Sequence, residues 1–461
     1  MLQGLLGRRF LTTGDTQTVR VHHIESRPHV QGCAAPLRVR HSSGELTDGG
    51  GLLLIRRLWD QMGIGQWLDG QSAAETGRFR PSLMVEMWTV LLLYGGGVMD
   101  DLTLLRARGV RRLFGWLRIP DPTTFGRWLR RSGETLVSVL DRLLWLLVQR
   151  RWQHVGTPSQ IMVVLDSTVV VRYGAKQAGA EIGYNPKKQG RPSHHPLVAF
   201  AAQTGDCLGV LWRPGSAHTA AGSMDWLRQI VGRLRALGIH DITVRMDKGF
   251  FSKEMVKALT DLQVRFFLKV PRYCWVRREL GPWRRSDKDD RLWTATGGLY
   301  GARLLACEWR AALGQKRPDE LPLDSYEVER DAFVLTNDPG VHALTAWRTY
   351  NEGALVEQRI EELGQLAVGR TAVDDIDGNK LLWALGALAY QMLHLMRTTA
   401  LSGSWRTAQP ERIRAWLFRL PGKLTRHARK TYVQLVRDEP LRKPLLAALR
   451  NVGGLAPLSA T

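Results

Sequence analysis

Two aspartates lie in apolar segments that are typical of buried β-strands. Asp166 stands within IMVVLDSTVVVRY, and Asp247 ends the segment ITVRMD. Either one alone would be interpreted as an ordinary strand-end or turn residue, but two in one sheet indicate more. A buried carboxylate is costly without a positive partner, and two that approach each other stay ionised only if they share a cation. Mg²⁺ fits this need, because it takes hard oxygen ligands, usually one or two carboxylates together with substrate phosphate.

Such a site favours chemistry on phosphodiesters. Two divalent ions about 4 Å apart can activate the attacking oxygen and stabilise the leaving one, which suits hydrolysis and transesterification. The sequence contains no GxSxG, HExxH or P-loop motif that would indicate another catalytic class.

A third metal ligand is expected from a helix that faces the sheet. In TYNEGALVEQRIEEL, Tyr350 and Glu357 are seven residues apart, which is two turns along one helix face. Glu361 lies one turn further along, whereas Glu352 and Glu362 are expected to be solvated. Most helix glutamates are surface residues, but the position of Glu357 after the last predicted strand favours it as the ligand.

The elements that must position these carboxylates follow the order β-β-β-α-β-α-β. The pattern predicts strands at 161–173, 196–203, 207–213, 242–247 and 264–270, and helices at 221–237 and 253–262. A turn at Thr204-Gly205-Asp206 separates the second and third strands. This order predicts an α/β fold in which helices cover a mixed sheet.

The regions that flank this core differ from it in their expected secondary structure. We expect a loose leader over 1–48 and a helical DNA-binding region over 49–155, with helices at 51–68, 83–94, 123–131 and 134–149. The catalytic core is expected over 156–270 and 339–400, interrupted by a β-rich insertion at 271–338. A basic helical C-terminal region is expected over 401–461.

The composition indicates an anionic partner. The 461 residues carry 65 Lys and Arg against 43 Asp and Glu, a net charge of +22. A polyphosphate is the usual partner of such a protein, because each neutralised phosphate releases counterions. The apolar stretches 87–99 and 381–396 are too short or too interrupted to cross a bilayer. Four scattered cysteines make a zinc site or a disulfide framework improbable, and a reducing cytosol fits.

The acidic motifs resemble those of the DDE transposases of bacterial insertion sequences. The similarity rests on Asp166 in LDST, on Asp247 in RMDKGF, and on Glu357 seven residues after the tyrosine of Tyr-Asn. The stretch GAEIGYNPKKQGRPSHHPLVAF is similar to the segment after the first Asp in the cut-and-paste branch that carries a β-rich insertion. The resemblance covers roughly 51–440.

The resemblance implies a ribonuclease-H-like core in which Asp166, Asp247 and Glu357 bind two Mg²⁺ or Mn²⁺ ions. It implies binding of transposon ends, strand cleavage, and transfer of the freed 3′-hydroxyl to double-stranded target DNA. Pairing of two ends implies a homodimer in the assembled complex. A bacterial, cytoplasmic and nucleoid-associated protein is expected.

The chain departs from the family pattern at two positions. Gly353 and Gly364 stand where related enzymes usually carry an Arg and a Lys that grip substrate phosphate. Tyr350 and Arg359 are expected to contact DNA, and Arg359 or Arg370 could replace the missing cations. Two alternatives therefore stay open: an inactive derivative that only binds DNA, and a ribonuclease-H-like nuclease without strand transfer.

Two basic segments are expected to contact the DNA backbone. Lys187, Lys188 and Arg191 lie in a Gly- and Pro-punctuated loop between the first two strands, where a merely solvated loop is an equally good interpretation. Arg127, Arg130 and Arg131 fall together at helical spacing. Phosphate contacts of this kind position a protein without reading sequence, and the segment 123–131 could also recognise the ends in a helix-turn-helix-like manner.

Seventeen tryptophans are a high number, and most are expected in the core. Trp275, Trp283 and Trp293 fall in the insertion instead. The resemblance implies that one of them stacks on a base flipped out during hairpin formation.

Overall fold

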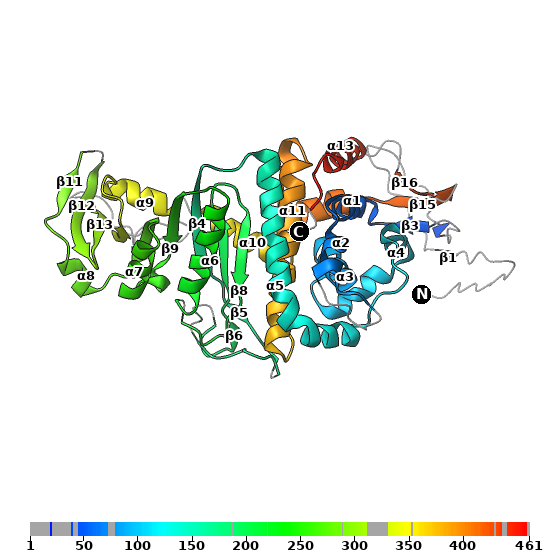
Figure 1. Cartoon of the computed structure of the whole chain (residues 1–461), viewed down its shortest axis with the longest axis horizontal. Helices are drawn as coiled ribbons and strands as arrows, with labels where there is room; N and C mark the ends of the chain where they lie inside the picture. Colours follow the sequence, from blue (N-terminus) through cyan, green and yellow to red (C-terminus); the bar gives the residue numbers. More distant parts are fainter. Residues whose placement is uncertain are drawn as a thin grey trace, which may run out of the picture.

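The computed structural model describes residues 19–20, 38–39, 45–71, 79–174, 176–183, 185, 188–218, 220–287, 289–310, 331–351, 354–427, 430–435 and 440–458. The molecule is elongated, with a large sheet towards one end and a helical body at the other (Figure 1). Nearly all of the expected leader over 1–48 lies outside the described residues, apart from the short pair β1 (Val19–Arg20) and β2 (Arg38–Val39) and the strand β3 (Glu45–Thr47).

The core of the sheet follows the order predicted from the sequence. Its first three strands are antiparallel, and the next two run parallel to the first. Reading across the sheet, the order is β8-β7-β4-β9-β10, which is the strand order of a ribonuclease-H-like core. The strands are β4 (Gln160–Ser167), β7 (Leu197–Ala201), β8 (Cys207–Leu211), β9 (Asp241–Met246) and β10 (Arg265–Val270).

The β-rich insertion extends this same sheet. β14 pairs antiparallel with β10, and β13, β12 and β11 continue outward to give a nine-stranded sheet. Figure 1 shows these strands at the end of the molecule farthest from the helical body. The inserted elements are α8 (Cys274–Arg278), β11 (Arg284–Ser286), β12 (Asp289–Leu299), β13 (Ala302–Trp309) and β14 (Asp331–Thr336).

Helices cover both faces of the sheet. Val163 and Leu165 of β4 belong to the core formed with α6 (Ser223–Ala236) and α7 (Lys253–Asp261), whereas Val164 belongs to the core formed with α11. Because side chains alternate along a strand, Asp166 shares the face of Val164. The helices after the insertion are α9 (Ala343–Asn351), α10 (Ala354–Gln365) and α11 (Ile376–Thr399).

One long helix, α5 (Pro122–Val155), replaces the two helices expected at 123–131 and 134–149. Gly133, which falls between the two expected helices, is the point where α5 crosses the start of α11. A Cβ atom there would lie 2.4 Å from the carbonyl carbon of Asp377. Glycine at this position therefore permits close packing against α11 within one continuous helical range.

The helical body combines the two ends of the described chain. The tail, expected to be helical, also contains a hairpin of β15 (Gly422–His427) and β16 (Lys430–Leu435), and β15 pairs with β3. The amide of Leu458 also donates to the carbonyl of Met62, at 2.9 Å. The helices are α1 (Leu53–Met62), α2 (Ile64–Gln71), α3 (Pro81–Tyr94), α4 (Arg108–Phe114), α12 (Pro410–Arg412) and α13 (Arg442–Gly453).

Short elements complete the described structure. They are β5 (Val170–Val171), β6 (Ser193–His194), η1 (Gly50–Leu52), η2 (Met99–Arg106), η3 (Lys248–Phe250), η5 (Gly403–Trp405) and the π-helical turn η6 (Ile413–Phe418). Among the described residues no single helix has the length and apolarity to cross a membrane, although α3 and η2, bent by 90°, would pass such a test jointly.

A buried polar joint fastens α5 and α11 to the β7–β8 turn. Asp206, which is fully buried, accepts hydrogen bonds of 2.7 Å each from Arg151, Trp152 and Gln391. We name these four side chains the Asp206 joint. A buried charge is tolerated only when it is paired and hydrogen-bonded, so this joint constrains how the two helices sit on the sheet.

Asp206→Ala is expected to destabilise the protein by about 3–5 kcal/mol, because it leaves Arg151 buried without its counter-charge. Urea denaturation followed by circular dichroism measures the change. Asp241→Ala is the matched control: it removes an exposed pair with Arg265, which is expected to contribute no more than about 1 kcal/mol. Equal losses for the two variants would contradict a structural role for the joint.

The buried side chain of Glu86 is expected to make the free energy of unfolding depend on pH. It is buried in α3 and accepts a hydrogen bond of 2.8 Å from the indole of Trp116, and burial raises its pKa to about 7 from 4.5. The folded state therefore holds a proton that the unfolded state releases, so the free energy of unfolding falls as pH rises from 4.5 to 7. Glu86→Gln should remove this slope and add up to about 3 kcal/mol above pH 7. Unchanged urea midpoints between pH 5 and pH 8 would contradict this.

Candidate active site

Asp166 and Asp247 lie at the carboxyl ends of two neighbouring parallel strands. β4 and β9 are in register from Gln160 opposite Asp241 to Leu165 opposite Met246. The next residue on each strand is one of the two aspartates, on strands spaced about 4.8 Å apart. The two aspartates singled out from the sequence therefore lie side by side at one edge of the sheet.

The surroundings of Asp166 penalise its charge. Burial raises the pKa of this carboxyl to about 6 from 3.8, and the negative charges of Asp247 and Glu357 raise it further. The amide of Ser167, which donates to Asp166 at 2.7 Å, and the guanidinium of Arg245 act in the opposite direction. The charges of the other two predicted acids therefore both act on Asp166.

Glu357 is placed differently from the expectation. It is an exposed residue in the first turn of α10, whereas Tyr350 belongs to α9, so the two do not share one helix face. Glu352 and Gly353 lie outside the described residues. Among the residues that the structure describes, no three His, Cys, Asp or Glu side chains are close enough together to hold a metal ion. The carboxylates fit a hard divalent cation by donor type, and Glu357 is the exposed member of the predicted set.

Tyr350 ties α9 to this site. Its hydroxyl donates to Asp247 at 3.0 Å, and its ring lies 5.1 Å from the guanidinium carbon of Arg245 and 5.1 Å from the ammonium nitrogen of Lys269. Burial and the nearby Asp247 raise the pKa of Tyr350, so it is a neutral hydrogen-bond donor. Sequence reasoning missed Arg245 and Lys269, although their alternation with apolar neighbours in two predicted strands was a readable signal.

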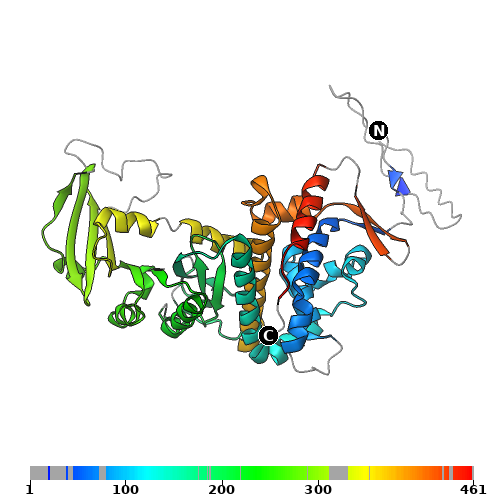
Figure 2. The same ribbon diagram turned by 45° about the horizontal axis from the view of Figure 1, so that its top comes forward.

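The insertion supports α9. Ala343 and Ala346 are buried in a cluster with Phe267 of β10 and Val334 of β14. The ring of Trp347 packs 4.6 Å from that of Trp309 on β13. Figure 2 shows α9 lying beside the insertion strands. The inserted strands thereby fix the helix that carries Tyr350.

One of the two glutamates expected to be solvated, Glu362, is instead buried. Glu362 is 1% exposed and accepts hydrogen bonds from Arg397 at 3.0 and 3.1 Å and from Arg359 at 2.8 Å. The expectation of a solvated Glu362 was wrong because its partner lies 35 residues away on α11. Of the two arginines expected to replace the missing cations, Arg359 is engaged in this ion pair and Arg370 is exposed beside Gly97. A Cβ atom at Gly364 would meet open space.

The other predicted DNA-binding residues lie on the surface. Lys188 and Arg191 are exposed, and Lys188 donates to the hydroxyl of Tyr173; Lys187 lies outside the described residues. The arginines predicted to group on one helix face are all exposed at the start of α5, and Arg130 pairs with Asp374 at 2.5 Å. They are Arg127, Arg130 and Arg131.

The insertion tryptophans have different surroundings. Arg310 covers the rings of Trp293 and Trp283, at 4.3 and 5.8 Å. Trp275 is 42% exposed and joins an aromatic cluster with Tyr273, Phe251 and Tyr300. Of the three, Trp275 is the most open to a stacking partner.

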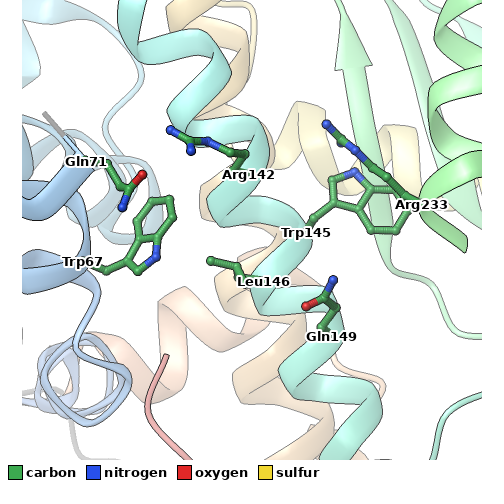
Figure 3. A pocket seen from close by; sticks show the side chains of 7 residues that line it. All are labelled: Trp67, Gln71, Arg142, Trp145, Leu146, Gln149 and Arg233. Atoms are coloured by element: carbon green, nitrogen blue, oxygen red, sulfur yellow. The ribbon is translucent and has the colours of Figure 1, made fainter. Parts of the chain in front are cut away.

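A pocket of about 230 Å³ lies apart from the carboxylates, between α2, α5 and α6 (Figure 3). Trp67 and Trp145 line it, and Arg233 lies over the ring of Trp145, at 5.3 Å. It contains no acidic side chain, so it does not fit the metal chemistry considered above. The remaining lining residues are Gln71, Arg142, Leu146 and Gln149.

The sequence matches the family described as transposase DDE domain group 1 over residues 31–457. The chain belongs to this family. It is therefore a transposase, a metal-dependent enzyme that cleaves and transfers DNA strands, and its family uses divalent metal ions.

The chain is similar to a solved transposase structure. That structure is a piggyBac transposase synaptic complex with hairpin DNA, at 13% identity and a TM-score of 0.40, with 80% of each chain covered. No curated protein gives a significant sequence match.

Bound metal is expected to stabilise the folded protein through the two strand-end aspartates. At about 100 times the dissociation constant, Mn²⁺ should add about 2.7 kcal/mol to the free energy of unfolding, measured as a rise in the thermal midpoint. Asp166→Asn and Asp247→Asn should each lose most of that rise. Asp241→Asn, at the opposite end of β9, should respond like the original protein. An undiminished rise in both site variants would place the metal elsewhere.

Proposed function

We propose that this transposase serves a bacterial insertion sequence: it binds the element's ends, hydrolyses the end phosphodiester and joins the freed 3′-hydroxyl to target DNA. The observation that carries this proposal is the in-register adjacency of Asp166 and Asp247 in a chain of the DDE family. Double-stranded DNA is the substrate, at the bacterial nucleoid, and two copies of the chain pair the two ends.

The three acids take distinct roles in this proposal. Asp166 and Asp247 are anchored on strands and provide the fixed half of a site for two Mg²⁺ or Mn²⁺ ions. When bound, such ions activate the attacking oxygen and stabilise the leaving oxygen. Glu357 completes the site from the first turn of α10. Tyr350 holds the Asp247 carboxylate in a fixed orientation by its hydrogen bond.

Basic residues of two segments position the DNA. Arg127, Arg130 and Arg131 at the start of α5, and Lys187, Lys188 and Arg191 in the loop after β5, are proposed to contact phosphates, which gives affinity that falls steeply with salt. Arg359 is not assigned to this surface, because Glu362 already engages it.

A second candidate is a derivative that binds ends without cutting them. Gly364 favours it, because the position faces open space and provides no cation. The two candidates agree on DNA binding and differ only in whether phosphodiester bonds break.

Incubation with DNA from the borders of its own element, a target plasmid and Mg²⁺ tests the proposal. The original protein should yield cleaved ends and joined products. Asp166→Asn, Asp247→Asn and Glu357→Gln should each lower the cleavage rate by about 10³-fold or more, the size of a lost metal contribution of several kcal/mol.

Three results would redirect the assignment. Cleavage at an unchanged rate by all three variants would refute the carboxylate site. Binding of the ends without any cut by the original protein would identify the inactive derivative, and cuts without joined product would identify a nuclease. Gel mobility and sequencing of product junctions distinguish these outcomes.

A further inference from the structure

The acidic site contains two cations that stand on the sheet. β10 pairs in parallel with β9, with Phe267 opposite Arg245 and Leu268 opposite Met246. Lys269 is the next residue and therefore neighbours Asp247. Side chains of residues in register share a face of the sheet, so Arg245, Asp247 and Lys269 all face the same way as Asp166.

Tyr350 fixes the spacing of these two cations. Both lie 5.1 Å from its ring, and the ring is held by the hydrogen bond from its hydroxyl to Asp247. Attraction between a cation and an aromatic face is strongest where water is partly excluded. The tyrosine thus holds a guanidinium and an ammonium beside the carboxylates.

Arg245 has unused binding capacity. It is partly buried, and within the part of the chain that the structure describes it makes no hydrogen bond or salt bridge. Its charge nevertheless interacts with Asp166, Glu357 and Asp247. A guanidinium offers five donors suited to planar, bidentate recognition of phosphate, and here those donors are preplaced where the substrate phosphodiester must come.

We propose that Arg245 and Lys269, spaced by Tyr350, form a binding site for a DNA phosphate next to the bond being cut, and that Arg245 serves as counter-charge to the carboxylates before metal and DNA arrive. This inference rests on the function proposed above. It assigns the contacts to the phosphate next to the cut bond to strands β9 and β10, and not to the helix that carries Glu357.

The two parts of the proposal predict opposite effects for Arg245→Gln. Removal of a positive charge beside the carboxylates should lower by a few-fold the Mn²⁺ concentration that gives half of the thermal stabilisation. The same variant should lower the cleavage rate about 10- to 100-fold, the loss expected for one or two charge-assisted hydrogen bonds. Lys269→Gln should reduce cleavage in the same direction, and Arg245→Lys should restore part of it.

DNA affinity provides a readout that does not depend on catalysis. With a short duplex that carries the element's end, each glutamine variant should reduce the slope of log affinity against log salt by about one. Arg265→Gln, at the opposite end of β10 and paired with Asp241, is the matched control and should leave metal response, cleavage and salt slope unchanged.

Several results would overturn the phosphate site. One is an unchanged salt slope in both glutamine variants; another is a parallel loss of metal response and cleavage in Arg245→Gln, which would mark a purely structural residue. If the original protein binds ends but never cuts, the proposed function fails while the salt slopes and metal titrations still decide this inference.

Discussion

The parallel, in-register pairing of β4 with β9 places two carboxylates side by side, and the rest of the molecule has to accommodate the repulsion between them. The register of this pairing cannot shift, because both strands are buried on both faces. A slip by one residue would move every core side chain to the other face. Burial raises the pKa of Asp166 to about 6, so the charged form is penalised whenever no cation is present. Negative charge at this pair of carboxylates is therefore unfavourable in the fold, and divalent ions can offset it.

The buried ion pairs decide which parts of this site are fixed. The Asp206 joint and the Glu362–Arg397 pair clamp α11 and the later turns of α10 to the sheet. Glu357 stands in the first turn of α10, exposed and away from that clamp. Val356, the residue before it, is buried in the core, so the start of α10 is also packed against the rest of the protein. Glu357 therefore differs from the two strand-borne acids in its exposure to solvent.

The sequence was informative where local pattern determines structure. Runs of apolar β-branched residues around Asp166 and Asp247 predicted the strands to within about two residues at most ends, and their order gave the ribonuclease-H-like core. The failures concern contacts distant in sequence. Ser132-Gly133 looks like a helix break, because nothing local reveals that α11 crosses there. Glu362 looks like a surface residue, because Arg397 is not visible from its own helix. The pairing of β3 with β15, and the addition of the insertion to the main sheet, likewise depend on register between remote segments.

The cations near the carboxylates were likewise not predicted from local sequence. The family pattern places such cations around Glu357, at positions 353 and 364, where this chain has glycine. Arg245 and Lys269 instead alternate with buried residues on strands, a pattern easily dismissed as the polar face of a half-exposed sheet. Cations on β9 and β10 share the rigid frame of Asp166 and Asp247, so their distance from those carboxylates is set by the sheet. Electrostatic stabilisation is most effective when the charges are preorganised and need no rearrangement as the reaction proceeds. A phosphate bound by strand-borne cations would thus keep its position relative to Asp166 and Asp247 throughout the reaction.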